Sequence, residues 1–316
     1  MKRLLWIVLI AILVGGLGTL GVLRLVYGKT AADFDESMVS GATKRTYQVH
    51  LPDSAPEKGA PLLIVLHGVG ATGDSTRMLT RNGLNRLADQ EGLVVVYPDG
   101  IARQWNDGQI KSFFGSQGRP DDVRFISDLI DKMADTRGID RGRVYVAGIS
   151  NGGAMAERLA LDLPDRVTAI AVVAMTLPKG MEQHPSTPPI PVLLINGTED
   201  PVVPWGGGEI TFLGKRGQVL SAEETARFWV RRCGCAERPV VTTEPDRDPK
   251  DGTRVEREYY GGGKNGTEVL RYTVTGGGHT WPGGMQYLPE SVIGRTSRDI
   301  DANQVIWSFF KGKTRG

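Results

Sequence analysis

The chain has 316 residues, 42 of them glycine, and a formal net charge of +2 from 38 basic and 36 acidic side chains. Glycine follows no fixed period, which excludes a fibrous protein, and the near-balance of charge argues against a surface that binds nucleic acid. The length is sufficient for one large α/β domain with a sizeable core.

Residues 1–26 begin with Lys2 and Arg3 and continue with an uncharged apolar run from Leu4 to Leu23. Such a run is long enough to cross a bilayer as a helix of about 20 residues, whereas the apolar part of a cleaved signal peptide has roughly 7–15. We therefore expect an apolar N-terminal helix that acts as an uncleaved membrane anchor, with a cleaved signal peptide as the alternative. Both interpretations place the rest of the chain outside the cytoplasm.

Residues 27–44 are polar and rich in small side chains, which predicts a linker. From residue 45 to residue 316, short apolar runs alternate with helical patterns, which is typical of a doubly wound, mostly parallel sheet. The expected strands are Leu62–Leu66, Leu93–Tyr97, Val144–Ala147, Ala169–Ala174 and Val192–Ile195, and an antiparallel hairpin is expected from Val255–Tyr259 and Val269–Val274. Helices are expected near 78–90, 122–136, 152–162, 221–232 and 301–311.

The sequence from Gly148 to Gly152 reads Gly-Ile-Ser-Asn-Gly, with an expected strand before it and an expected helix after it. In a strand–serine–helix elbow, a strained backbone holds the serine hydroxyl above the sheet. Glycines allow the chain to turn so sharply. The context therefore favours Ser150 as a nucleophile over a structural serine in a glycine turn.

A serine hydroxyl needs a base to become nucleophilic at neutral pH. In the order typical of this elbow, the acid and then the histidine follow the serine. Of the four histidines, only His184 and His279 follow Ser150, and His184 precedes the next complete strand. We therefore predict His279 as the base. Asp200 follows the Val192–Ile195 strand and is the expected orienting acid, with Glu199 as the competing carboxylate.

Acyl transfer also needs backbone donors for the oxyanion of the tetrahedral intermediate. One donor is expected from Asn151, the residue after the nucleophile, and the other from the loop after an early strand. The sequence His67-Gly68-Val69-Gly70 occupies that loop. We assign the second donor to Val69, with Gly70 as the alternative, and interpret His67 as a residue that shapes the loop.

Five sequence blocks together resemble the polyhydroxybutyrate depolymerase and feruloyl esterase family of α/β-hydrolases. The blocks are Leu66–Gly68, Tyr97–Gly100, Gly148–Gly152, Asn196–Pro204 and Gly278–Gly283. The resemblance implies an α/β-hydrolase fold, a Ser150–Asp200–His279 triad, no cofactor, and ester substrates such as aromatic acyl-sugars or short polyester oligomers. The chain departs from the family at Val69 and Ala71, where members often have a cysteine and a polar residue.

Trp105, Trp205 and Trp281 lie in three loops expected on the active side of the sheet. Aromatic rings there could stack against a phenolic acyl group or a sugar, and the alternative is that they fill space inside the loops. The two cysteines, Cys233 and Cys235, are too close in sequence for an unstrained bridge. We expect free thiols, with a labile redox pair as the alternative.

We find no cluster of histidine, cysteine or carboxylate residues with metal-ligand spacing, and we expect no metal and no cofactor. The sequence thus predicts a serine carboxylic ester hydrolase that acts outside the cytoplasm through an acyl-enzyme on Ser150. Its expected partners are an ester substrate and, if residues 1–26 stay attached, a membrane. An acyltransferase to an envelope sugar or lipid, or a non-catalytic tethered binding module, would be the alternatives.

Overall fold

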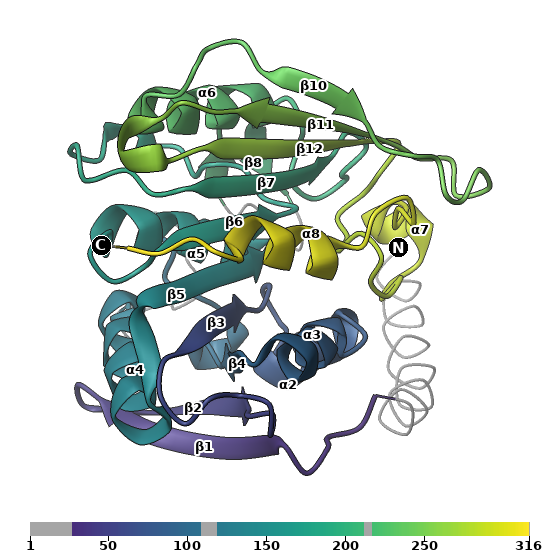
Figure 1. The fold of residues 1–316 in the computed structure, drawn as a ribbon. Coiled ribbons are helices and arrows are strands. Elements are labelled where there is room, and N and C mark those ends of the chain that lie inside the picture. The colour runs from purple at the N-terminus through teal and green to yellow at the C-terminus, as the bar shows by residue number, and fades with distance from the viewer. Residues whose placement is uncertain (1–26, 109–118, 212–216, 316) are drawn as a thin grey trace.

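A computed structural model describes residues 27–108, 119–211 and 217–315 of the chain. In this part of the chain, ten strands form one sheet in the order β1-β2-β4-β3-β5-β6-β7-β12-β11-β10 (Figure 1). The strands, in sheet order, are Asp33–Ser40, Thr43–His50, Val94–Pro98, Ala60–Leu66, Ile139–Ile149, Ala169–Val173, Val192–Gly197, Val269–Thr275, Arg254–Tyr260 and Val240–Thr243. A separate two-stranded sheet pairs β8 (Gly208–Ile210) with β9 (Gly217–Val219).

The centre of the large sheet is parallel, and both of its edges are antiparallel. All five apolar runs expected as strands form parallel strands, and the expected hairpin is formed by β11 and β12. Strand β12 also pairs in parallel with β7, so the hairpin extends the main sheet. The expectation of a mostly parallel sheet with helices is confirmed.

Helices cover both faces of the sheet (Figure 1). On one face, buried side chains of α4 (Asp122–Arg137), α5 (Asn151–Asp162) and α6 (Ala222–Cys233) join the strands in a single core. On the other face, α3 (Gly83–Glu91) and α8 (Ala302–Phe310) bury their apolar sides in a second core. Because both faces are covered, the central strands contain continuous buried apolar runs, such as Val144–Ala147 in β5, rather than alternating residues.

Local signals define the helix ends. A reciprocal capping box between Ser221 and Glu224 begins α6, which ends where Gly234 adopts a left-handed conformation. The helix expected near 78–90 is two helices, α2 (Gly73–Leu79) and α3, because Arg81 and Asn82 both have positive φ values and break the helical path. A four-residue helix, α7 (Glu290–Ile293), lies after the last strand.

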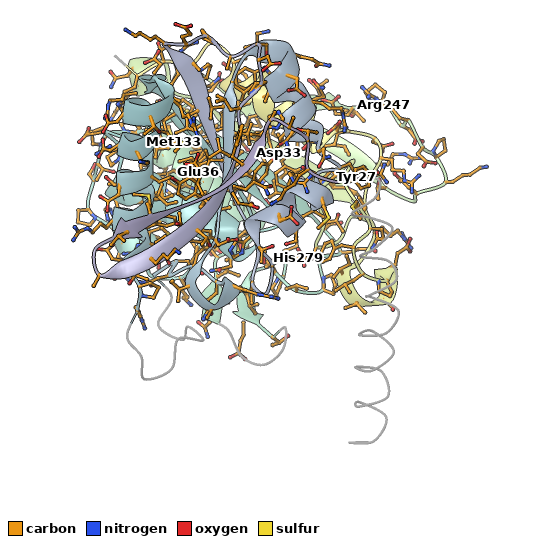
Figure 2. The ribbon with its side chains drawn as sticks, turned by 90° about the horizontal axis from the view of Figure 1, so that it is seen from below. Tyr27, Asp33, Glu36, Met133, Arg247 and His279 are labelled. Carbon is orange, nitrogen blue, oxygen red and sulfur yellow. The ribbon has the colours of Figure 1, made fainter. Side chains whose placement is uncertain are left out.

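The prediction of a linker at 27–44 is wrong. Strand β1 lies within that segment, and all of its residues pair with β2. Asp33 on β1 contacts the buried ring of His50 at 2.8 Å, and Arg77 donates to the Tyr27 carbonyl at 2.6 Å. Figure 2, which views this side of the molecule, shows Asp33 and Glu36 on that strand. The polar side chains that suggested a linker belong instead to an edge strand.

The anchor or signal peptide expected at 1–26 lies outside the described residues. Among the residues that are described, no helix is both long enough and apolar enough to span a bilayer. Cys233 and Cys235 are free thiols, as the sequence predicts, and both are buried.

Candidate active site

Ser150 lies at the turn between β5 and α5, at the centre of the large sheet. Its backbone has φ 56° and ψ −126°, which is a strained conformation for a residue with a side chain. The serine occupies the N-cap position of α5, so the first N–H groups of that helix follow it directly. This is the strand–serine–helix elbow that the sequence predicts.

Close backbone approaches explain the glycines around Ser150. A Cβ atom on Gly148 would lie 2.1 Å from the carbonyl oxygen of Gly152, and one on Gly152 would lie 2.3 Å from the carbonyl oxygen of Leu66. Both distances are far below any real contact, so neither position can hold a larger residue without a shift of backbone. The absence of these two side chains lets α5 begin directly against β3 and β5.

His279 and Asp200 come from the loops that follow β12 and β7, which are parallel neighbours in the sheet. The carboxyl ends of the two strands therefore meet at one edge, and Nδ1 of His279 lies 2.8 Å from Oδ2 of Asp200. The other carboxylate oxygen accepts the N–H groups of Val202 and Val203 at 2.7 and 2.8 Å. Both side chains of the pair are buried, whereas the competing Glu199 is exposed.

Ser150 and His279 line the same cavity, which has a volume of about 610 Å³. The loop after β3 forms the side of this cavity nearest the serine, since a Cβ atom on Gly68 would lie 3.4 Å from the Cβ and 3.9 Å from the Oγ of Ser150. Val69 also lines the cavity. The sequence-predicted serine, histidine and oxyanion loop therefore line one cavity.

The structure distinguishes the two residues proposed as the second oxyanion donor. Gly70 donates its N–H to the Arg103 carbonyl at 2.8 Å, so this group is already used. Of these two residues, Val69 therefore remains the candidate donor from this loop. The N–H of Asn151 lies in the first turn of α5, where a helix supplies no acceptor of its own.

His67 shapes this loop, as the sequence predicts. Its Nε2 accepts the Gly100 N–H at 2.9 Å, so Nδ1 carries the proton and donates to the Gly68 carbonyl at 2.8 Å. Burial lowers the pKa of His67, which favours this neutral form. The ring thus joins the ends of β3 and β4 and takes no proton from Ser150.

The tryptophans expected to contact substrate fill loops instead. Trp105 is 1% exposed and donates to the His67 carbonyl, and Trp281 is fully buried and donates to Asn303. The prediction that Trp105 and Trp281 stack against the substrate is therefore wrong, because neither ring lines the cavity. Trp205 is half-buried, lies near the Arg271 guanidinium and does not line the cavity either.

The cavity wall is mainly aliphatic and thioether, which the sequence reasoning missed. Two segments supply most of it, helix α2 and the excursion from Met285 to Ile293. The large aliphatic and thioether side chains that line it are Val69, Met78, Leu79, Ile149, Val202, Met285, Leu288 and Ile293. Backbone bonds hold the excursion to α2 and to the catalytic loop, since Met285 donates to the Leu79 carbonyl and His279 donates to the Ile293 carbonyl. The sequence signal that could have indicated this wall is the set of apolar residues that follow His279, namely Met285, Leu288 and Ile293.

The side chain of Asn151 has a second function that its sequence position did not indicate. Its amide nitrogen donates to the Trp105 carbonyl and to Asp107, and its oxygen accepts the Trp105 N–H at 2.7 Å. The residue after the serine thus fixes the loop that follows β4 against the start of α5.

Comparison with known proteins agrees with this geometry. A family model described as phospholipase/carboxylesterase matches residues 52–212. The esterase NocK of Nocardia uniformis subsp. tsuyamanensis is 35% identical over 289 residues, which cover 88% of this chain and 82% of that protein. The chain belongs to the phospholipase/carboxylesterase family. This carboxylesterase-family chain is a serine esterase, a hydrolase that acts on ester substrates.

Other relatives of this carboxylesterase match shorter parts. Feruloyl esterase B of Piromyces equi is 29% identical over 232 residues, and the match covers 71% of this chain but only 40% of that protein. Poly(3-hydroxyalkanoate) depolymerase C of Paucimonas lemoignei is 30% identical over 40% of this chain and 30% of its own length. The expected resemblance to esterases of these names is confirmed.

A solved structure supports the fold. The acetyl xylan esterase from Aspergillus awamori superimposes with a TM-score of 0.56 at 15% identity, over 79% of this chain and 94% of that chain. At this identity the likeness concerns the fold alone. Together with the family match it establishes the α/β-hydrolase fold of this carboxylesterase.

Proposed function

We propose that this esterase works through an acyl-enzyme on Ser150. The Ser150 oxygen attacks the ester carbonyl carbon while Nε2 of His279 takes the hydroxyl proton. The C–O bond to the alcohol then breaks, and His279 returns the proton to the departing alkoxide. A water molecule, deprotonated by the same ring, cleaves the acyl-enzyme and restores Ser150.

The contact between Asp200 and His279 supports this assignment most strongly. Because Nδ1 is bound to the carboxylate, Nε2 is the ring nitrogen left to serve as the base. The buried carboxylate also stabilises the imidazolium that forms during attack. In our proposal the N–H groups of Val69 and Asn151 donate to the oxyanion, at the positively polarised end of α5.

Of the two expected substrate classes, we propose short polyester esters with aliphatic acyl groups over aromatic acyl-sugars. The cavity is lined by aliphatic and thioether side chains, which adapt to flexible chains. Tyr287 is the one Phe, Tyr or Trp among the described residues of the lining, and its hydroxyl donates to the His279 carbonyl at 2.9 Å. Among the described residues that line it there is no Asp, Glu, Lys or Arg, which favours a neutral acyl group.

We further propose that the catalytic domain acts outside the cytoplasm. The support for this comes from the sequence, in which Lys2 and Arg3 precede the uncharged run from Leu4 to Leu23. Fractionation of cells that express the full chain, followed by protease treatment of intact spheroplasts, would test it. Protection of the domain from protease would contradict this location.

An ester panel tests the proposed reaction. The panel contains nitrophenyl butyrate and octanoate, hydroxybutyrate oligomers, methyl ferulate and acetylated xylan. We expect the aliphatic esters to give the highest kcat/KM, and Ser150→Ala to lower turnover of every substrate by at least about 10⁴-fold. Added alcohol acceptors would reveal an acyltransferase. Unchanged activity in Ser150→Ala would refute the nucleophile, whereas a preference for ferulate would refute only the substrate class.

A further inference from the structure

Strand β10 (Val240–Thr243) forms one edge of the ten-stranded sheet, and in the described residues it pairs only with β11 (Figure 1). All four of its residues are exposed, including Val240 at 66% and Val241 at 52%. An uncharged edge strand with exposed β-branched side chains is a template for pairing with another strand. Soluble proteins usually blunt such edges with charge.

The opposite edge of the sheet is blunted in this way. Strand β1 carries three acidic residues, Asp33, Asp35 and Glu36, beside the exposed Phe34 and Val39. No such charge lies within β10. The two edges of the sheet therefore differ in charge.

The outward-facing backbone groups of β10 follow from its pairing with β11. Glu244 donates its N–H to the Val255 carbonyl at 2.9 Å, and residues 244, 242 and 240 therefore face β11. By the same alternation, the backbone groups of Val241 and Thr243 face away from the sheet. Pro239, which precedes the strand, has only a carbonyl to offer on that side.

We propose that β10 pairs antiparallel with β10 of a second copy of this chain, about a two-fold axis at Val241. In this register the two Val241 residues exchange both N–H···O bonds, and each Thr243 donates to the Pro239 carbonyl opposite. Because proline has no N–H, the second hydrogen bond between Thr243 and Pro239 is missing at each end of the paired strands. The Thr243 carbonyl is thus left without a donor, whereas the Thr243 N–H and both backbone groups of Val241 are satisfied.

The charges that flank β10 support this register. A two-fold axis at Val241 brings Arg238, which lies in the bend just before the strand, to the same end of the paired strands as Glu244 of the second copy. The same register sets Val240 against Thr242. An opposite-charge pair therefore closes each end of the paired strands, and it would be lost on a shift by one residue.

Disulfide trapping of the full-length chain tests this interface. In the proposed dimer the two Val241 Cα atoms lie about 5.5 Å apart, within the range that a disulfide spans. The two Thr243 Cα atoms would be about 14 Å apart along the strands. We expect Val241→Cys to form a covalent dimer under mild oxidation, and Thr243→Cys to remain monomeric. The native thiols are buried, so the unmodified chain serves as background.

Charge reversal in the Val241→Cys background tests the register. Arg238→Glu or Glu244→Arg alone should lower the cross-linking yield by about threefold or more, and the two together should restore it, because the pairs are then re-formed with opposite polarity. Equal cross-linking at 243 and 241, no cross-linking at 241, or no recovery in the double variant would each overturn the proposal. Esterase activity, measured in parallel, should remain unchanged in all variants and reports that they are folded.

Discussion

The elbow around Ser150 (the fixed region) and the apolar side chains of α2 and residues 285–293 that line the cavity (the exchangeable wall) lie side by side but differ in how they are packed. At the elbow, backbone meets backbone, and the spaces at Gly148 and Gly152 admit no side chain. In the wall, flexible side chains of α2 and the 285–293 excursion face an open volume of about 610 Å³. The comparison indicates that the reaction is fixed by backbone geometry, whereas substrate choice depends on side chains that can be exchanged.

The largest expected effect concerns the fixed region. Asp200→Asn should lower kcat by about 10⁴-fold, because an amide in place of the carboxylate favours the wrong tautomer of His279. Steady-state kinetics on nitrophenyl butyrate measures this loss. Glu199→Gln is the matched control, since its carboxylate is exposed, and it should retain near-normal activity. A similar loss in both variants would remove the distinction between these neighbouring acids.

A buried acid on α5 provides a second test of the fixed region. Burial raises the pKa of Glu157 to about 8, above its value of 4.5 in the unfolded chain, and Trp229 donates to its Oε1 at 3.1 Å. Because the folded chain holds the Glu157 proton more tightly than the unfolded chain, protonation of Glu157 stabilises the fold. This contribution to the free energy of unfolding is fully present below pH 4.5 and is lost as the pH rises through 8.

Glu157→Gln keeps the shape and removes the charge. At pH 9 we therefore expect this variant to be more stable than the native chain by ~4 kcal/mol, with little difference at pH 5. Urea unfolding at the two pH values measures the change. Equal stability differences at both pH values would mean that Glu157 does not stay protonated in the folded chain.

Packing at the elbow gives the third prediction. Gly152→Ala should cost about 3 kcal/mol of stability and about 10²-fold in kcat, because its Cβ would displace α5 from the Leu66 carbonyl. Gly206→Ala is the control, since nothing lies within 4 Å of its added Cβ. Thermal unfolding and kinetics are measured together. Full activity in Gly152→Ala would show that the elbow is less constrained than its geometry indicates.

The smallest effect should come from the exchangeable wall. Met285→Trp should lower kcat/KM for nitrophenyl octanoate by about tenfold and leave the butyrate ester nearly unaffected, because the indole fills space that a longer chain needs. Val39→Trp, on the exposed edge strand β1, is the control. An equal loss on both esters would mean that the substitution disturbs the reaction itself rather than the fit of the chain.

The sequence predicted the fixed region well because its signals are local. The glycines around Ser150, the apolar strand before it and the helix after it all lie within a short stretch. Asp200 and His279 could be assigned because each follows a strand, and parallel strands bring their carboxyl ends together.

Contacts between distant segments could not be predicted in the same way. The burial of Trp105 depends on His67 and Asn151, and that of Trp281 depends on Asn303. The break between α2 and α3 depends on left-handed conformations at Arg81 and Asn82, two residue types that also occur within helices. Strand β1 was mistaken for a linker because its partners, such as His50, lie on another strand.

Labelling by a fluorophosphonate tests the proposed relay most directly. The reagent forms a bond to a serine only where a base activates the hydroxyl and oxyanion donors receive the phosphoryl oxygen. Peptide mass mapping of the full chain should locate one equivalent of label on Ser150, with none incorporated in Ser150→Ala and much slower labelling in Asp200→Asn. Label on a different residue, or a folded native chain that never reacts, would contradict the account.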